Sequence, residues 1–391
     1  MSKMYDVLII GAGPAGGSAA KSCAESGLSV LLVEEHKVVG EPLHCGECVS
    51  KICLDKLGEV PDSVIAKKVK GIKLYFPKNK IHYVDEEGAV VHKEKFEQWI
   101  IKTAKKAGAE IKLNTKVTAL KKLKNSWIIS TNNSRLKEIK AKIIIDASGA
   151  QAVTSNLLGL NKKFDIVMGL QYRIDDIAQT EYLDFYLLPD YAPNGYLWMI
   201  PKSDGSANVG LVTTDGSKLK PLLDSFVKLN KWENKKVTKI FGGPIPASGP
   251  VKNTFEDGLM LIGDAAGFTS PLFEGGTHLG IQSGIFAASV AKKAITTKDY
   301  SKKMLKEYYD LWHSEFPDYN KLVRGKEDLY SLKNKELAEF SDTMPSQLGK
   351  LTPKDKLFVL KKLFENKKML TRKTFRIFNA FRYSRSKKYG W

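Results

Sequence analysis

The sequence predicts a mixed α/β fold (α+β in part), because three kinds of pattern follow one another along its 391 residues. A run of strand, glycine turn, helix and strand opens the chain over 5–35. A strand-rich stretch follows at 167–212, and a helical pattern occupies nearly everything after about residue 280. We therefore expect an α/β unit with a parallel sheet, an inserted β-sheet domain and a helical C-terminal region.

The opening run has the pattern of a dinucleotide-binding βαβ unit. Residues 7–10 are apolar without alternation, as in a strand covered on both faces. Gly11, Gly13 and Gly16 then fill G-x-G-x-x-G, which allows a tight turn, close approach of a pyrophosphate and close helix–strand packing. Glu34 ends the next strand, 21 residues after Gly13, where an acid would bind a ribose hydroxyl. The pattern predicts a Rossmann-like site for FAD or NAD; the alternative is an ordinary βαβ unit with a chance glycine triplet.

Further elements are expected in order after this unit. Strands are expected between Ala66 and Tyr83. The segment 91–111 has a helical pattern, and Gly108 within it is expected to end the helix. The segment 167–212 has turn signals at Asn194-Gly195 and elsewhere, which favours several short strands. Further strands are expected at Lys112–Leu120, Trp127–Thr131, Ile143–Ile145 and Leu259–Ile262.

This order divides the chain into three expected regions. The stretch 242–250 is rich in glycine and proline and marks a crossing between domains. Strands near 66–85 are candidates to join the inserted sheet. The expected regions are a discontinuous cofactor-binding domain (1–165 and 250–300), a substrate-binding β-sheet domain (166–249) and a basic helical region (301–391).

Composition narrows the class of protein. Hydrophobic residues make up 43% and charged residues 27%, which are globular values. No apolar run reaches the length of a spanning helix, and the strand that starts at Tyr5 leaves no room for a signal peptide. The four cysteines lie within 23–53 and do not form a secreted disulfide framework. We expect a cytoplasmic protein.

The positive charge is concentrated at the C-terminus. The net charge is +19, and residues 351–391 contain 13 lysines and arginines against two acids. Basic amphipathic helices of this kind favour peripheral contact with an anionic membrane, on the inner face of the cell membrane. The alternative is a helical cap with a solvated lysine face. No nucleic-acid motif accompanies the charge, so we expect no nucleic-acid partner. The interleaved apolar residues are Leu357, Phe358, Leu360, Leu363, Phe364, Phe375, Phe378, Phe381 and Tyr383.

A second signature lies at 259–288. It again runs from a strand to an acid turn, a glycine loop and a helix. Asp264 at the strand end can bind the sugar-like chain of a flavin cofactor. Gly275 and Gly276 open a helix whose N–H groups could stabilise charge on a reduced flavin ring. The alternative is a glycine-rich turn without chemical use.

The two signatures, together with Asp146-Ala-Ser-Gly149, resemble flavoproteins of the para-hydroxybenzoate hydroxylase-like fold. The resemblance covers residues 4–290 and implies non-covalent FAD rather than NAD. Lys93 stands where that superfamily usually has an arginine, and Ala119 or its neighbours would hold the adenine through backbone groups. The implied FAD-binding residues are Gly11, Gly13, Pro14, Ala15, Gly16, Glu34, Glu35, Cys45, Gly46, Lys93, Ala119, Asp264, Gly275, Gly276 and Thr277.

Two further motifs resemble the geranylgeranyl reductase family, in particular its archaeal branch acting on digeranylgeranylglycerophospholipids. The first is PLHCGECVS, residues 42–50, and the second is FYLLPDYAPNGYLWMIPK, residues 185–202. Asn194 replaces a glycine of the family pattern and Ile200 replaces an aromatic residue. The resemblance implies reduction of C=C bonds in a polyprenyl lipid, in the biosynthesis of archaeal membrane phospholipids.

Such a substrate offers no hydrogen bonds, so only an apolar tunnel can hold it. Phe185, Tyr196, Trp198 and Pro201 are the candidate substrate-binding residues, with an ordinary aromatic sheet core as the alternative.

Cys45 and Glu47 are the candidate catalytic residues. Cys45 would serve as proton donor or as a wall of the site, with a structural thiol as the alternative, and Glu47 would otherwise bond nearby backbone or shape the entrance. Cys45 and Cys48 also form C-x-x-C, which a redox dithiol would use, and the sequence does not decide whether they form a disulfide. No metal site is expected.

Other activities of the same fold are the competing interpretations. The segment 196–201 approaches the W-x-W-x-I-P pattern of flavin-dependent halogenases, which need a catalytic lysine; Lys73, Lys78 and Lys80 are available. An FAD-dependent monooxygenase or hydroxylase is compatible with the fold alone. A scaffold that has lost activity is the non-enzymatic alternative. The electron donor stays open among NAD(P)H, reduced ferredoxin and deazaflavin; a basic chain would attract an acidic ferredoxin.

Overall fold

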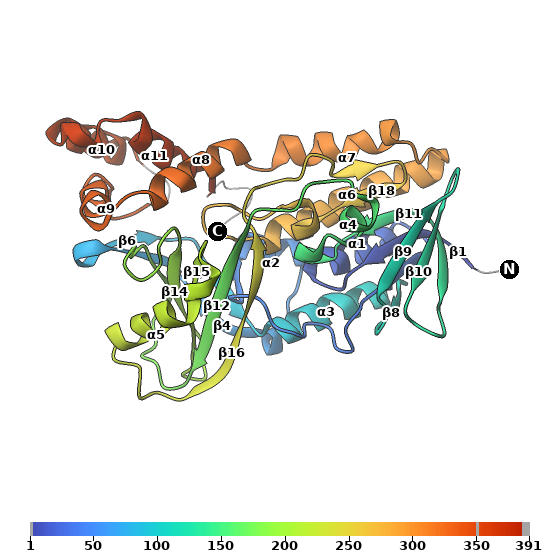
Figure 1. The fold of residues 1–391 in the computed structure, drawn as a ribbon, viewed down its shortest axis with the longest axis horizontal. Coiled ribbons are helices and arrows are strands. Elements are labelled where there is room, and N and C mark those ends of the chain that lie inside the picture. The colour runs from blue at the N-terminus through green and yellow to red at the C-terminus, as the bar shows by residue number, and fades with distance from the viewer. Residues whose placement is uncertain (1–2, 349–351, 385–391) are drawn as a thin grey trace.

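The computed structural model describes residues 3–348 and 352–384, and Figure 1 shows their arrangement. A larger sheet lies toward the N-terminus, a second sheet lies beside it, and helices run along one side of both (Figure 1). The C-terminal residues 385–391, the side chain of Tyr383 and residues 349–351 lie outside the described part of the chain.

The first sheet has eight strands and carries the cofactor signatures. β1 pairs in parallel with β2 and β11, and β11 pairs in parallel with β18. Because these strands run the same way, their carboxyl ends meet at one edge, and ligands of open α/β sheets bind there. The strands are β17 (Phe255–Glu256), β18 (Leu259–Leu261), β11 (Glu138–Asp146), β1 (Met4–Ile10), β2 (Val30–Val33) and β8 (Glu110–Lys112), with β9 (Val117–Lys122) and β10 (Trp127–Thr131) off β11.

Helix α1 (Pro14–Glu25) packs closely against α3 (Lys93–Lys106) and against α6 (Thr277–Thr297) beside this sheet. Glycine makes the approach possible. A Cβ on Gly17 would lie 2.5 Å from an Ile100 side-chain atom, and one on Gly284 would lie 2.6 Å from the Ala15 carbonyl oxygen. The tight packing fixes the N-terminal ends of α1 and α6 relative to each other. The other helices of this half are α2 (Lys51–Leu57), α4 (Val153–Leu158) and α7 (Lys302–Glu315).

The second sheet has seven strands, and its two faces have different partners. Helix α5 (Leu219–Leu229) covers one face, where Leu223 and Phe226 join a buried cluster with Leu197 and Leu211. The opposite face carries the side chains of the aromatic motif. β5 pairs in parallel with β13, so the segment 71–84 belongs to this sheet. The strand order is β16 (Val237–Pro246), β12 (Ile166–Ile174), β15 (Ala207–Thr213), β14 (Tyr196–Pro201), β13 (Tyr182–Tyr186), β5 (Gly71–Phe76) and β6 (Lys80–Val84).

A third sheet, which the sequence analysis does not separate, has three short strands: β3 (Cys48–Ser50), β7 (Gly88–Val91) and β4 (Ile65–Val69). β3 begins directly after the Cys-Gly-Glu motif. Its pairing with β7 therefore anchors one end of the loop that carries this motif.

The C-terminal helices share a core with the second sheet. Helices α8 (Tyr319–Tyr330), α9 (Asn334–Ser341), α10 (Pro353–Glu365) and α11 (Arg372–Ser384) lie at one end of the molecule (Figure 1). Leu322, Phe340 and Phe381 are buried in one cluster with Phe185 and Trp198. In the described residues no helix combines the length and apolarity needed to cross a bilayer.

Candidate active site

A cavity of about 840 Å³ extends from the carboxyl edge of the eight-stranded sheet to the aromatic face of the seven-stranded sheet. Both cofactor signatures, the Pro42–Ser50 motif and the aromatic motif contribute lining residues. The structure therefore brings together segments that are more than 200 residues apart in the sequence.

The glycine turn forms an open cradle at one end of this cavity. Gly11 has a φ of +103°, and a Cβ there would lie 2.4 Å from the Ala147 carbonyl oxygen. A Cβ on Gly16 would lie 2.0 Å from the Gly11 carbonyl oxygen, whereas one on Gly13 would have no heavy atom within 4 Å. The first and third glycines thus permit the backbone packing. The second leaves open space at the N-terminus of α1, where a pyrophosphate would bind.

The two acids that follow β2 line the cavity. Glu34 Oε2 accepts a hydrogen bond from the Ala12 N–H at 2.8 Å, and Glu34 Oε1 accepts one from the His36 N–H at 2.9 Å. Glu35 forms an ion pair with Lys116 at 2.8 Å. Pro14 and Ala15 also line this end, as predicted for the cofactor site. The position of Glu34 beside the glycine turn is the one that ribose binding requires.

Asp264 and the N-terminus of α6 form the next part of the cavity. Burial raises the pKa of the Asp264 carboxyl, and Thr269 Oγ1 donates to its Oδ1 at 3.2 Å. A Cβ on Gly276, the residue that caps α6, would lie 3.1 Å from that same oxygen. Gly275 and Thr277 line the cavity as well. The acid and the free N–H groups of the helix are therefore adjacent.

Lys93 begins α3, and its partly buried side chain forms an ion pair with Glu97. Burial disfavours its charge, but the Glu97 carboxylate holds the pKa of Lys93 above its usual value. Lys93 lines the cavity, so its cation is available to a bound cofactor.

Ala119 does not line the cavity; it is exposed on β9. Thr115, Lys116 and Val117 line it instead. The register between β9 and β10 shifts between Ser130 and Thr131, and Val117, two residues earlier, stands at this irregularity. A bulge changes which residues face a site, so backbone groups near Val117 are better placed to hold an adenine than those of Ala119.

FAD fits the residues present at this end of the cavity. An open glycine cradle, a ribose-binding acid, a partly buried cation and an acid next to a helix N-terminus follow one another along its wall. Together they match the phosphates, sugars and ring of a flavin dinucleotide.

The opposite wall is aromatic. The rings of Phe185 and Phe273 stack with centroids 5.8 Å apart, and the Tyr196 ring meets Phe273 edge-on at 5.3 Å. Trp198 lies 5.6 Å from Tyr196. Pro201, a predicted substrate-binding residue, is buried but does not line the cavity; Ile200 lines it in its place. Side chains alternate along β14, so Pro201 stands on the other face from Trp198 and Tyr196.

A hydrogen-bonded chain connects this wall to the Cys-Gly-Glu loop. Trp198 Nε1 donates to Gln171 Oε1 at 3.2 Å, and Gln171 Nε2 donates to the Cys45 carbonyl oxygen at 2.9 Å. Sequence reasoning missed Gln171 because its two partners lie at remote positions of the chain. The chain fixes the Trp198 ring relative to Cys45.

Cys45 lies at the cavity with its thiol turned toward the loop itself. The Glu47 N–H donates to Cys45 Sγ at 3.2 Å, and burial raises the pKa of the thiol. The side chain is therefore a neutral thiol at physiological pH. All four cysteines are free, including Cys48.

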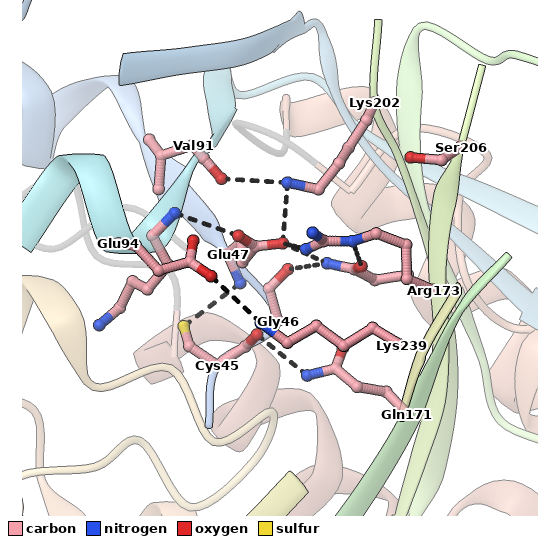
Figure 2. Close-up of polar contacts among 12 residues, drawn as sticks. Cys45, Gly46, Glu47, Val91, Glu94, Gln171, Arg173, Lys202, Ser206 and Lys239 are labelled. Carbon is pink, nitrogen blue, oxygen red and sulfur yellow. Dashed lines mark hydrogen bonds and ion pairs between the residues drawn. The ribbon is translucent and has the colours of Figure 1, made fainter. Parts of the chain in front are cut away.

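Glu47 is the most extensively bound residue of the motif, and Figure 2 shows its partners. Its side chain is 0% exposed. Lys202 Nζ lies 2.8 Å from Oε2, Asn208 Nδ2 donates to Oε2 at 2.6 Å, and Arg173 pairs with the same oxygen. Oε1 accepts from the Lys93 N–H at 3.1 Å.

These four donors occupy the Glu47 carboxylate, which favours a structural role for Glu47, with one bond to backbone, over the predicted catalytic one. Its φ of +74° is unusual for a residue other than glycine. Burial lowers the pKa of Lys202, although the Glu47 carboxylate opposes this. The geometry is that of a buried ionic clamp, which we define as Glu47 with Lys202, Arg173 and Asn208.

The three lysines considered for a halogenase-type reaction lie away from the cavity. Lys73 lies over the Tyr182 ring at 5.2 Å, and Lys80 pairs with Asp342. Neither they nor Lys78 line the cavity.

Comparison with known proteins agrees with this site. A family model described as FAD dependent oxidoreductase matches residues 6–155, and one described as geranylgeranyl reductase catalytic domain matches residues 165–245. The digeranylgeranylglycerophospholipid reductase of Methanosarcina acetivorans is 34% identical over 88% of this chain and 89% of its own length. The chain belongs to the geranylgeranyl reductase family.

Other relatives of this reductase agree. The enzyme of the same name from Thermoplasma volcanium is 34% identical over 88% of this chain and 92% of its own length. A crystal structure of a geranylgeranyl bacteriochlorophyll reductase-like protein from Thermoplasma acidophilum superposes with a TM-score of 0.85 at 30% identity, covering 95% of this chain and 99% of that one. Halogenase PltM in complex with FAD shares the fold alone, with a TM-score of 0.71 at 16% identity, over 87% of this chain and 79% of its own. The reductase is thus a flavin-dependent oxidoreductase that uses FAD.

The ionic clamp predicts a large stability effect in this reductase. Glu47→Ala would leave Lys202 buried without its carboxylate, so we expect the free energy of unfolding to fall by about 3–5 kcal/mol. Urea denaturation measured by tryptophan fluorescence checks this. The control is Asp55→Ala, which removes the exposed pair with Lys51 (2.8 Å) and should change stability little. Equal effects of the two substitutions would contradict the clamp.

Proposed function

We propose that this protein saturates C=C bonds of geranylgeranyl chains in archaeal ether-lipid precursors, as a digeranylgeranylglycerophospholipid reductase. One observation carries the proposal: the FAD-fitting cradle and the aromatic wall open into the same cavity, with the Cys45 loop between them. The names of the relatives support the same substrate class.

The chain's residues contribute binding and orientation. Reduced FAD, when bound, supplies a hydride to one carbon of the double bond. An isolated alkene is a poor hydride acceptor, so close positioning must supply much of the rate. Phe185, Tyr196 and Trp198 provide a broad apolar surface that excludes water and holds the polyprenyl chain. We assign Cys45 to the wall of this site, because its raised pKa keeps the thiol neutral and apolar in character.

The electron donor belongs to this proposal as well. NAD(P)H, a deazaflavin or a reduced ferredoxin would each suffice to reduce the bound flavin. The net charge of +19 favours association with an acidic ferredoxin over a neutral partner.

One assay tests the proposed reaction. The reduced, FAD-loaded protein is incubated without oxygen with a geranylgeranyl lipid, and the lipid is analysed by mass spectrometry. We expect a gain of about two mass units for each double bond, since a hydride and a proton add to it. No mass gain with any donor, dithionite included, would overturn the proposal.

The aromatic wall gives a prediction of its own. Trp198→Ala removes the largest side chain of the wall and the bond to Gln171, so we expect turnover to fall by about tenfold or more while bound FAD, read from its absorbance, is retained. Cys45→Ala should lower turnover in the same direction. Trp232→Ala, in the cluster on the opposite face of the sheet, is the control that removes an indole elsewhere. If the Trp198 variant reduced the lipid as fast as the wild type, the aromatic wall would not be the substrate-binding surface.

We also propose that α10 and α11 contact an anionic membrane. Leu357, Leu360 and Phe364 follow one another at helical spacing on α10, and Leu357 and Phe364 are 68% and 64% exposed. In α10, Leu363 is the buried side chain that attaches the helix to the protein. The exposed basic residues nearby are Lys354, Lys356, Lys361, Lys367, Lys368, Arg372 and Arg382. Apolar side chains surrounded by cations suit the boundary of an anionic lipid surface.

Vesicle flotation tests this contact. Leu357→Glu and Phe364→Glu should each weaken binding to phosphatidylglycerol-containing vesicles by roughly tenfold or more, because each removes about 1.5–3 kcal/mol of apolar burial and adds repulsion. Ile240→Glu changes an equally exposed apolar residue (60%) on β16 and serves as the control. The proposal would be contradicted if vesicle binding changed neither with the α10 substitutions nor with the charge of the vesicles.

A further inference from the structure

Glu274 is an acid that lies between the cofactor end of the cavity and its aromatic wall. It lines the cavity and directly precedes Gly275 and Gly276. Its φ is +48°, a left-handed conformation that glycine adopts freely and that a glutamate adopts at a cost. Strained backbone of this kind gathers at functional sites, where the surrounding structure holds it in place.

Two tyrosine hydroxyls hold the loop that carries Glu274. Tyr330 donates to the Leu272 carbonyl oxygen at 2.7 Å, and Tyr196 donates to the Phe273 carbonyl oxygen at 2.9 Å. The Tyr196 hydroxyl also lies beside the Glu274 carboxyl group. Oε2 of Glu274 is buried and accepts no hydrogen bond from any residue in 3–348 or 352–384.

A large share of the carboxyl group is therefore protonated near neutral pH, since an unpartnered buried carboxylate is costly. Burial raises the pKa of Glu274 to about 7, against the opposing influence of Lys326 and of the adjacent Tyr196 hydroxyl. Lys326 and Tyr330 face the group from α8, and Tyr196 faces it from β14. Burial raises the pKa of both tyrosines further, so neither competes as an acid.

We propose that Glu274 is the proton donor of the reduction, an inference that rests on the proposed function. As the hydride from reduced FAD forms a C–H bond at one alkene carbon, the π electrons form the second C–H bond with the proton of Glu274. The O–H bond of the carboxyl breaks, and its electrons remain on the Glu274 carboxylate. FAD bound in the cavity would supply the two electrons that the alkene gains, and the Glu274 carboxylate takes a proton from solvent before the next turnover.

Cys45 is the other proton-bearing side chain that the sequence singles out at the cavity. Burial raises the pKa of this thiol from an already higher ordinary value, so it is the weaker acid at neutral pH. A general acid works best when its pKa lies near the operating pH, which favours Glu274.

The decisive variant is Glu274→Gln, which keeps the shape and removes the acidic proton. We expect turnover of the geranylgeranyl lipid to fall by about 100-fold or more, the usual contribution of a general acid. Wild-type turnover should be constant below a pH of about 7 and fall above it, because the proton is lost as the pH rises through the pKa of Glu274. This pH-dependent limb should be missing in the variant.

Asp184→Asn is the matched control. Asp184 is also a buried acid whose pKa burial raises to about 7, and its Oδ1 likewise accepts no hydrogen bond within the described ranges. It stands on β13 next to Phe185 and does not line the cavity. The Asn variant should keep both the turnover and the pH profile of the wild type.

Two readouts do not depend on activity. Infrared difference spectra of the FAD-loaded protein, recorded above and below pH 7, should contain a protonated-carboxyl contribution from Glu274 that Glu274→Gln removes and Asp184→Asn leaves in place. Glu274→Gly should melt no lower than the wild type, because glycine relieves the positive φ, and it should lose turnover as the Gln variant does. A folded, inactive Gly variant separates chemistry from folding.

The outcomes separate the two proposals. If the wild type reduces the lipid but the Gln variant retains most of its turnover or the pH limb, the proton role is overturned and the proposed function stands. If the Gln variant keeps both the fall in turnover above pH 7 and the infrared band, another group is responsible for these two signals and not Glu274. If the wild type leaves the lipid unreduced with every donor, both proposals fall.

Discussion

The buried carboxylate of Glu47 is the interaction on which the cavity depends. The acid belongs to the loop that follows the first nucleotide-binding unit, whereas Arg173, Lys202 and Asn208 belong to the second sheet or lie next to its strands. A charge held away from water is tolerated only when its partners are all in place. The loop, the N-terminus of α3 and the sheet are therefore fixed relative to one another, and the distance between cofactor site and aromatic wall follows from that.

A weaker connection runs in parallel. Gln171 joins the Trp198 indole to the backbone of Cys45. It stands on β12 two residues before Arg173, so the aromatic wall and the loop are connected at a second point of the same strand. The ion pairs of Glu47 and the neutral hydrogen bonds of Gln171 therefore both orient the loop that carries Cys45. The Cys45 thiol needs no charge of its own to be held in place, because these other residues determine where it lies.

Local patterns in the sequence were enough for part of this arrangement. Gly11, Gly16 and Asp264 act through backbone geometry within a few residues, so their spacing predicts their positions. Ala119 and Pro201 do not line the cavity: the strand of the first has a register shift nearby, and strand alternation places the second opposite Trp198. The side chains that bind Glu47, those of Arg173, Lys202 and Asn208, lie more than 120 residues away, and no short-range pattern predicts an ion pair of that kind.

Glu274 illustrates another limit. Its acid side chain follows an apolar run and precedes two glycines, which reads as an ordinary turn. What distinguishes it is a buried Oε2 that accepts no hydrogen bond from the described residues, together with two tyrosines that come from remote segments of the chain. Such a feature arises from the enclosure of the group, which is a property of the folded chain.

Helix α11 has Phe375 exposed at 45% on its outer side and Phe381, which lines the cavity, on its inner side. The rings of Phe381 and Phe273 are 6.0 Å apart. A helix is about 10 Å wide, so the outside of the molecule and the interior of the cavity are separated here by a single layer of polypeptide. A water-insoluble chain entering beside this helix would exchange one apolar environment for another across that layer, with little exposure to water on the way.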